Sequence, residues 1–326
     1  MRRRLGGPWT DMAAPTEVTA AAPGARTSGW RRVAGHAGRV SLGLIFLMAG
    51  ILKALDPAEF VHQIAGYGLL GARLPAYAAP ALIVLEITLG IALLAGARPL
   101  WAGLASIVLL AVFIAIEAYG LSIGRTEACG CFGAYVQRTP GQVIAEDLLF
   151  AALAVLAIWG LRQWRGLAVR RAVAVTSAGA LLAGGLVVAS PSLPIDRYVT
   201  RLAVGRSLAE LALQDRVPQL SQGRHLVALI DVTDPRAAET AAALNQIASR
   251  PGSPPILALT AASEEERAAF LWSAAPAFET KSVDRAVLKR LYRRLPCFFL
   301  LDSGRVAAVF DGAPPAAEDL LSWRPS

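Results

Sequence analysis

Apolar residues in the first two thirds of the chain gather in long, nearly unbroken segments. Five such segments, at about residues 40–55, 76–96, 100–123, 143–161 and 172–189, approach the roughly 20 residues that cross a bilayer. The first of them is the shortest. This pattern predicts an all-α four-helix membrane bundle over residues 39–162 and a fifth transmembrane helix over residues 170–190.

Beyond residue 196 the pattern changes to short apolar runs that alternate with amphipathic stretches. Residues 225–231 and 255–260 predict buried strands, and residues 296–312 predict a hairpin around an Asp-Ser-Gly turn. Helices are expected between the strands, one of them starting at Ser263, whose neighbours in the first turn are acidic. Residues 196–326 are therefore expected to form an α/β domain with a mixed sheet.

The N-terminal stretch, residues 1–38, is rich in Ala, Pro, Thr and Gly over most of its length and lacks apolar periodicity. Such a composition is typical of a disordered tail.

The placement of the arginines predicts how the spans are oriented in the membrane. The formal net charge is +8, but the arginines cluster beside the apolar segments, where such clusters set membrane topology. The ends of the spans that carry more arginines are expected to face the cytoplasm. This predicts an inner-membrane protein with a cytoplasmic N-terminus. After five crossings, the loop before the fourth span and the C-terminal domain face the periplasm. With 55% hydrophobic and 17% charged residues, the composition excludes an ordinary soluble protein and offers no nucleic-acid site; the bilayer is the expected environment.

Two of the three cysteines, Cys129 and Cys131, stand one glycine apart in the loop before the fourth span. A disulfide across one residue is strained, and strain makes it oxidising and labile. We expect this redox pair to exchange with a protein thiol or to pass electrons to a lipid-soluble acceptor such as a quinone. The alternatives are two packed, reduced thiols or a disulfide that only staples the loop. No metal site is predicted, because no histidine converges on the pair.

Carboxylates inside apolar spans are costly and mark candidate functional sites. Glu86 and Glu117 are candidates for proton coupling to thiol oxidation. The plainer alternative pairs Glu86 with Lys53. Glu146 and Asp147 are expected in the first turn of the fourth span, where carboxylates favour the helix dipole.

Three features of the membrane part resemble the MauE/DoxX-like family: the stretch "AGILKALDPAEFVHQIAGYGLL" (residues 49–70), Glu86, and "GCFG" in the cysteine loop. The likeness covers roughly residues 39–161. It implies a four-helix membrane protein linked to periplasmic redox maturation, of the kind that matures the disulfide-rich small subunit of methylamine dehydrogenase.

The C-terminal part resembles a thioredoxin-like domain, with Pro296 at the place of that family's cis-proline. Asp234 and Ala237 roughly occupy its two cysteine positions, so the domain is expected to be a degenerate thioredoxin fold. Cys297, beside Pro296, is a speculative relay partner for Cys129 or Cys131; the alternative is a small buried residue at a strand start.

The sequence thus predicts a membrane protein that supports thiol–disulfide maturation of periplasmic proteins, with a periplasmic client or a partner thiol oxidoreductase. Whether it is itself a thiol–disulfide oxidoreductase stays open. The alternative is a non-catalytic assembly or scaffold subunit whose cysteines only staple the loop.

Overall fold

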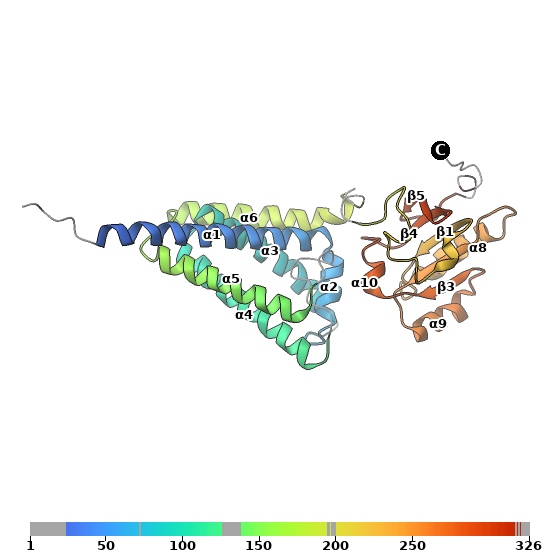
Figure 1. Cartoon of the computed structure of the whole chain (residues 1–326), viewed down its shortest axis with the longest axis horizontal. Coiled ribbons are helices and arrows are strands. Elements are labelled where there is room, and N and C mark those ends of the chain that lie inside the picture. Colours follow the sequence, from blue (N-terminus) through green and yellow to red (C-terminus); the bar gives the residue numbers. More distant parts are fainter. Residues whose placement is uncertain are drawn as a thin grey trace, which may run out of the picture.

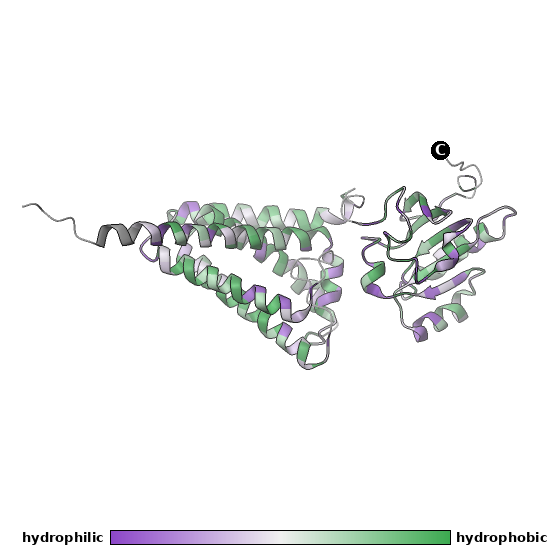
Figure 2. Ribbon diagram, in the orientation of Figure 1, coloured by the Kyte–Doolittle hydropathy of each residue, from purple (hydrophilic) through white to green (hydrophobic). Residues whose placement is uncertain are grey.

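The structure is a computed structural model, and it describes residues 24–71, 73–125, 138–193, 196, 200–316, 318 and 320. Five helices are long and apolar enough to cross a membrane: α1 (Gly24–Leu55), α3 (Pro75–Ala95), α4 (Pro99–Ser122), α5 (Pro140–Leu161) and α6 (Val169–Ala189). A short helix, α2 (Pro57–Ala65), follows α1. Figure 2 shows the five long helices coloured mainly hydrophobic. The predicted all-α bundle with a fifth apolar helix is confirmed.

In the bundle, α1 packs against α3 and α5, and α4 packs against α5. Towards the end that carries α2, α4 and α5 diverge from α1 and α3 (Figure 1). Helix α6 lies along α3, where Ala183 is buried and a Cβ at Gly179 would touch Ile91 at 3.0 Å. The small residues of the fifth span therefore pack it on the bundle.

Helix α1 begins earlier than the sequence predicted. It starts at Gly24, so residues 24–38 are helical and the expected tail through residue 38 was too long. The reason is tertiary packing: a Cβ at Gly35 would stand 2.8 Å from the Cα of Gly160 in α5. That close approach lets two helix backbones touch, and no local pattern in the sequence reports it.

The C-terminal domain is a five-stranded mixed sheet with the order β3-β2-β1-β4-β5. Its strands are β1 (Arg224–Leu229), β2 (Ile256–Thr260), β3 (Glu279–Ser282), β4 (Cys297–Asp302) and β5 (Arg305–Asp311). β1, β2 and β3 run parallel, while β4 is antiparallel to β1 and β5 to β4. Each expected strand is present.

Side chains of β1 alternate between two cores, as strand geometry requires. Leu226 and Ala228 pack with α8 (Ala237–Ala248) and with Phe270 of α9 (Glu264–Ala274). Val227 and Leu229 pack on the other face, with α10 (Arg285–Leu288) and the segment that leads into the sheet. Helices on both faces of this strand order make a thioredoxin-like domain, and the Leu295–Pro296 peptide is cis, as the resemblance implied.

Two helices of this domain differ in detail from expectation. Ser263 starts α9 with a reciprocal capping box to Glu266, as its sequence predicted. The helix expected between β3 and β4 is only the four residues of α10. The basic residues that follow α10 contact the membrane bundle instead of extending the helix.

Candidate functional site

The site lies at the α2 end of the bundle and begins with an ion pair. The Lys53 ammonium, at the end of α1, lies 2.6 and 2.7 Å from the two carboxylate oxygens of Glu86 in α3. Both side chains are 1% exposed, which confirms the Lys53–Glu86 pairing. Two charges removed from water gain little net stability from each other. An ionisable pair inside a membrane bundle is therefore a functional-site candidate.

Two more carboxyl groups share this region. Glu117 in α4 and Asp147 in α5 are 0% and 3% exposed. The charges of Lys53, Glu117 and Glu86 all act on the Asp147 carboxyl. We call Lys53, Glu86, Glu117 and Asp147 the buried ionisable cluster; each of four helices contributes one member.

The place of Asp147 corrects the sequence reasoning. Helix α5 begins at Pro140, capped by Thr139, so Glu146 and Asp147 lie about two turns inside it. Glu146 pairs with Arg138 and Asp147 faces the bundle interior. The sequence signal was present, since Asp147 directly precedes the apolar run "LLFAALAV", but the helix start was placed too late to use it.

An apolar cavity of about 150 Å³ adjoins the cluster. Lys53 is the one charged residue lining it; the rest of its wall comes from α2, α3, α4 and the chain after α2: Phe60, Ile64, Tyr67, Leu69, Leu70, Ala78, Leu82, Phe113 and Ile116. The Lys53 ammonium lies 5.3 Å from the Phe60 ring centre and 5.5 Å from that of Phe113. The cavity therefore combines aromatic walls with one buried cation.

The predicted redox pair, Cys129 and Cys131, lies outside the described residues. The chain on either side is described: the Arg125 guanidinium lies 4.2 Å from the ring centre of Tyr67, a wall residue of the cavity. On the other side Arg138 pairs with Glu146. The chain thus leaves α4 and enters α5 at the α2 end of the bundle (Figure 1).

The thioredoxin-like domain contacts the same end through basic residues that follow β3. The Lys289 ammonium is 2.7 Å from Asp56 and 3.7 Å from Glu59, and the Arg285 guanidinium donates to Glu59 at 2.8 Å. Burial acts to lower the pKa of Arg285, but the Glu59 carboxylate outweighs it and raises that pKa. We call these four residues the α2 latch.

Arg293 adds a second set of contacts. Its guanidinium donates to the backbone oxygens of Leu55, Ser190 and Leu193 and to the Asp196 carboxylate. The first two oxygens belong to the ends of α1 and α6, so a cation sits where helix carbonyls are unsatisfied. Asp56 in turn caps α2 by accepting from the Glu59 amide at 3.1 Å.

In the thioredoxin-like domain, Asp231, Asp234, Ala237 and Pro296 line one small cavity of about 20 Å³. The structure thus brings Asp234 and Ala237 beside the cis-proline, as predicted. The Asp234 carboxylate accepts from the backbone and side chain of Arg236, and these bonds lower its pKa. A carboxylate (Asp234) and a methyl group (Ala237) occupy the two positions where thioredoxins have cysteines. The residues that line this cavity therefore offer no thiol for exchange.

Cys297 is 2% exposed at the start of β4, and its thiol donates to Asp311 at 3.5 Å. Burial raises its pKa, and the Asp311 charge raises it further. A protonated, packed thiol is a poor nucleophile. This environment favours the alternative of a small buried residue over the relay role.

The comparisons with known proteins can now be set beside this geometry. Residues 31–160 match the family model described as methylamine utilisation protein MauE. The match covers most of α1, all of α2, α3 and α4, and nearly all of α5, so this part of the chain is similar to the MauE family. No curated protein matches the chain. Within the described residues, no group of three or more His, Cys, Asp or Glu is placed to hold a metal ion.

One solved structure with a detectable likeness is a secreted Mycobacterium tuberculosis disulfide oxidoreductase homologous to E. coli DsbE. It is 12% identical, and the match covers 36% of this chain and 91% of that one with a TM-score of 0.27. The thioredoxin-like assignment rests instead on the strand order and the helix placement of this C-terminal domain.

Proposed function

We propose that this protein is an inner-membrane thiol–disulfide exchange protein that supports maturation of periplasmic proteins. One observation carries the proposal. The two described ends of the cysteine-bearing connection, the buried ionisable cluster and the thioredoxin-like domain all meet at the α2 end of the bundle. The family description supports a client in methylamine utilisation, for which the small subunit of methylamine dehydrogenase is the candidate.

In this proposal Cys129 and Cys131 form the exchanging pair. A strained disulfide across Gly130 accepts two electrons readily. A client dithiol attacks it, a mixed disulfide forms, and the second client thiol resolves it. The client gains a disulfide and the loop becomes a dithiol. The thioredoxin-like domain, which has Asp234 and Ala237 at the cysteine positions, would hold a client or a partner oxidoreductase near the loop.

The loop dithiol must then be reoxidised, and the apolar cavity is the candidate site for the acceptor. A quinone-class molecule taking up two electrons and two protons would leave the disulfide re-formed. Phe60, Phe113 and Tyr67 suit a flat ring, and Lys53 suits a carbonyl oxygen. Glu86 and Glu117 remain the proton-coupling candidates, and Asp147 joins them.

A second candidate function is a scaffold that holds a partner without thiol chemistry. The α2 latch and the contacts of Arg293 favour it, because they fix a cysteine-poor domain on the bundle in a single geometry.

Trapping separates the two functions. In Cys131→Ala cells the loop cannot form its own disulfide, and the Cys129 thiolate of an exchange protein instead attacks a client disulfide, in the reverse direction of the exchange. The resulting mixed disulfide accumulates, because the Cys131 thiol that would release it is absent. We expect an adduct that reductant releases in Cys131→Ala, none in Cys129→Ala/Cys131→Ala, and an undiminished adduct in Cys131→Ala/Cys297→Ala. The absence of any adduct, with client maturation intact in the double variant, would establish the scaffold instead.

A further inference from the structure

A cavity of about 540 Å³ lies at the end of the bundle opposite α2. It is formed by the first described part of α1 and by the end of α5 with the turn that follows. Its wall consists of Arg31, Arg32, His36, Trp159, Gly160, Leu161, Arg162, Gln163 and Trp164. Neither the thiol chemistry nor the thioredoxin-like domain uses this cavity.

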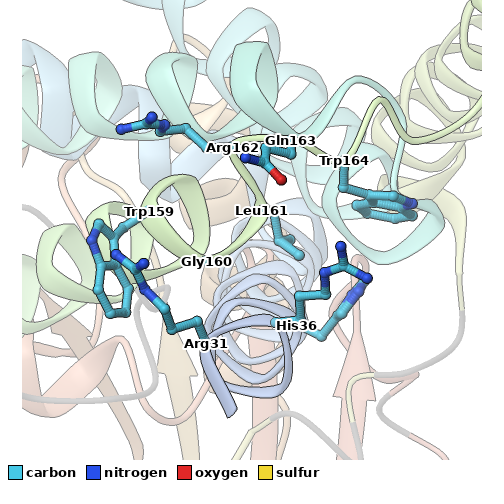
Figure 3. A pocket seen from close by; sticks show the side chains of 9 residues that line it. Arg31, His36, Trp159, Gly160, Leu161, Arg162, Gln163 and Trp164 are labelled. Carbon is cyan, nitrogen blue, oxygen red and sulfur yellow. The ribbon is translucent and has the colours of Figure 1, made fainter. Parts of the chain in front are cut away.

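Three arginines, two indoles, an amide and an imidazole line the cavity, and none of these nine residues is acidic. The Arg31 guanidinium lies 3.9 Å from the Trp159 ring centre, and the His36 ring meets the edge of Trp164 at 4.8 Å. Figure 3 shows Arg31 against Trp159 and His36 beside Trp164. Guanidinium groups held by indole faces keep their N–H edges directed outward, where they suit an anion with several oxygens.

The depth of the cavity adds a second constraint. It lies where the apolar spans α1 and α5 meet polar chain, and tryptophans at such a place sit at the level of lipid headgroups. Trp30 also packs near Trp159, with ring centres 5.5 Å apart. An occupant at this depth meets guanidinium groups above and apolar helix surface below.

We propose that this cavity binds the headgroup of an anionic phospholipid in the leaflet opposite the thioredoxin-like domain. The phosphodiester would accept from Arg31, Arg32 and Arg162, and the acyl chains would lie along the exposed apolar side chains of α1 and α5. Zwitterionic lipids carry an ammonium group, and no lining carboxylate is present to pair with it. The site therefore prefers phosphatidylglycerol or cardiolipin to phosphatidylcholine.

Native mass spectrometry of the full chain tests this preference. The purified protein is incubated with equal amounts of phosphatidylglycerol and phosphatidylcholine. The wild type is expected to retain phosphatidylglycerol at least about fivefold more often. Arg31→Gln/Arg162→Gln is expected to retain the two lipids about equally. The matched control, Arg170→Gln/Arg171→Gln, removes the same charge from exposed arginines at the same end of the bundle, outside the cavity, and keeps the preference.

Three outcomes would overturn the proposal. Equal loss of preference in the control would mean a diffuse basic face rather than a site. An undiminished preference in Arg31→Gln/Arg162→Gln would place the lipid elsewhere. Displacement of phosphatidylglycerol by inorganic phosphate as effective as by glycerophosphoglycerol would mean a site for a free anion. If the double variant does not fold, the single variant Arg162→Gln provides the test, and it is expected to lose part of the preference for phosphatidylglycerol.

Discussion

The Lys53–Glu86 pair is the feature that most constrains the bundle at the scale of single residues. Neither side chain reaches water, and each charge is compensated by the other at 2.6 Å. Because Glu117 and Asp147 are buried in the same region, Lys53 is the one cation that the described structure places among three carboxyl groups. Its charge therefore matters more than its packing volume.

Lys53→Met is expected to destabilise the bundle by about 3–5 kcal/mol, because it leaves Glu86 buried without its counter-charge. Lys53→Met/Glu86→Leu is expected to recover a large part of that loss, since both charges are then removed. The free energy of unfolding in detergent, measured with denaturant, gives the comparison. Leu85→Met, on the exposed side of α3, serves as the control. Equal losses in the single and double variants would contradict a role for the charge.

Cys297 allows a pH prediction. Its pKa is raised by burial and by the Asp311 carboxylate, and only the thiolate is alkylated. In a Cys129→Ser/Cys131→Ser background, alkylation of Cys297 should therefore rise with pH only well above the range of an ordinary thiol. Asp311→Asn removes the charge, so the rise should move to lower pH. Asp302→Asn, at the other end of β4, should leave the profile unchanged; a shift of equal size there would rule out the Asp311 contact as its cause.

Among the secondary-structure elements, the short helix α2 makes contacts with two different parts of the molecule. Asp56 caps it and also pairs with Lys289, Glu59 on its first turn pairs with Arg285, and Phe60 lines the apolar cavity. One short helix thus contacts the thioredoxin-like domain and also lines the apolar cavity. Movement of the domain and access to the cavity are expected to be coupled through it.

Lys289→Met should loosen α2. The change leaves Asp56 and Glu59 facing each other in a nearly buried place, and like charges there repel. Amide hydrogen exchange in residues 57–65 should become at least about tenfold faster, which corresponds to a local loss of ~1.4 kcal/mol. Lys281→Met provides the control, because Lys281 donates to the Arg216 carbonyl inside the soluble domain. Unchanged exchange in α2 would mean that the latch adds no stability.

The helices and strands were largely predictable from the sequence, but the contacts between them were not. Unbroken apolar runs sufficed for five spans, and short buried apolar runs sufficed for β1 and β2, because both patterns are local. The start of α1 depends on Gly35 touching Gly160, and the length of α10 depends on Lys289 reaching Asp56. These contacts join residues more than a hundred positions apart. For the same reason the sequence missed the α2 latch. It indicated Glu86 and Glu117 as candidates but not Asp147, because the start of α5 was placed too late.

At the scale of the whole molecule, the two ends of the bundle have different chemistry. The α2 end carries acidic residues that pair with the soluble domain, whereas the opposite end carries an arginine-lined cavity with tryptophans. Because α1, α3, α4, α5 and α6 alternate in direction, the thioredoxin-like domain and the start of α1 lie at opposite ends (Figure 1). Positive-inside bias then predicts that the basic end faces the cytoplasm.

Accessibility labelling in intact cells tests that orientation. In a background with all three cysteines changed to serine, Gln222→Cys places a thiol before β1 of the soluble domain, and Arg165→Cys places one between α5 and α6; both positions are exposed. A maleimide that passes the outer membrane but not the inner one should label the Gln222→Cys variant in intact cells. It should label the Arg165→Cys variant only after lysis, because we expect the basic end to face the cytoplasm. The reverse pattern would place the cysteine loop in the reducing cytosol, where a strained disulfide could not persist, and would remove the basis for thiol exchange in the periplasm.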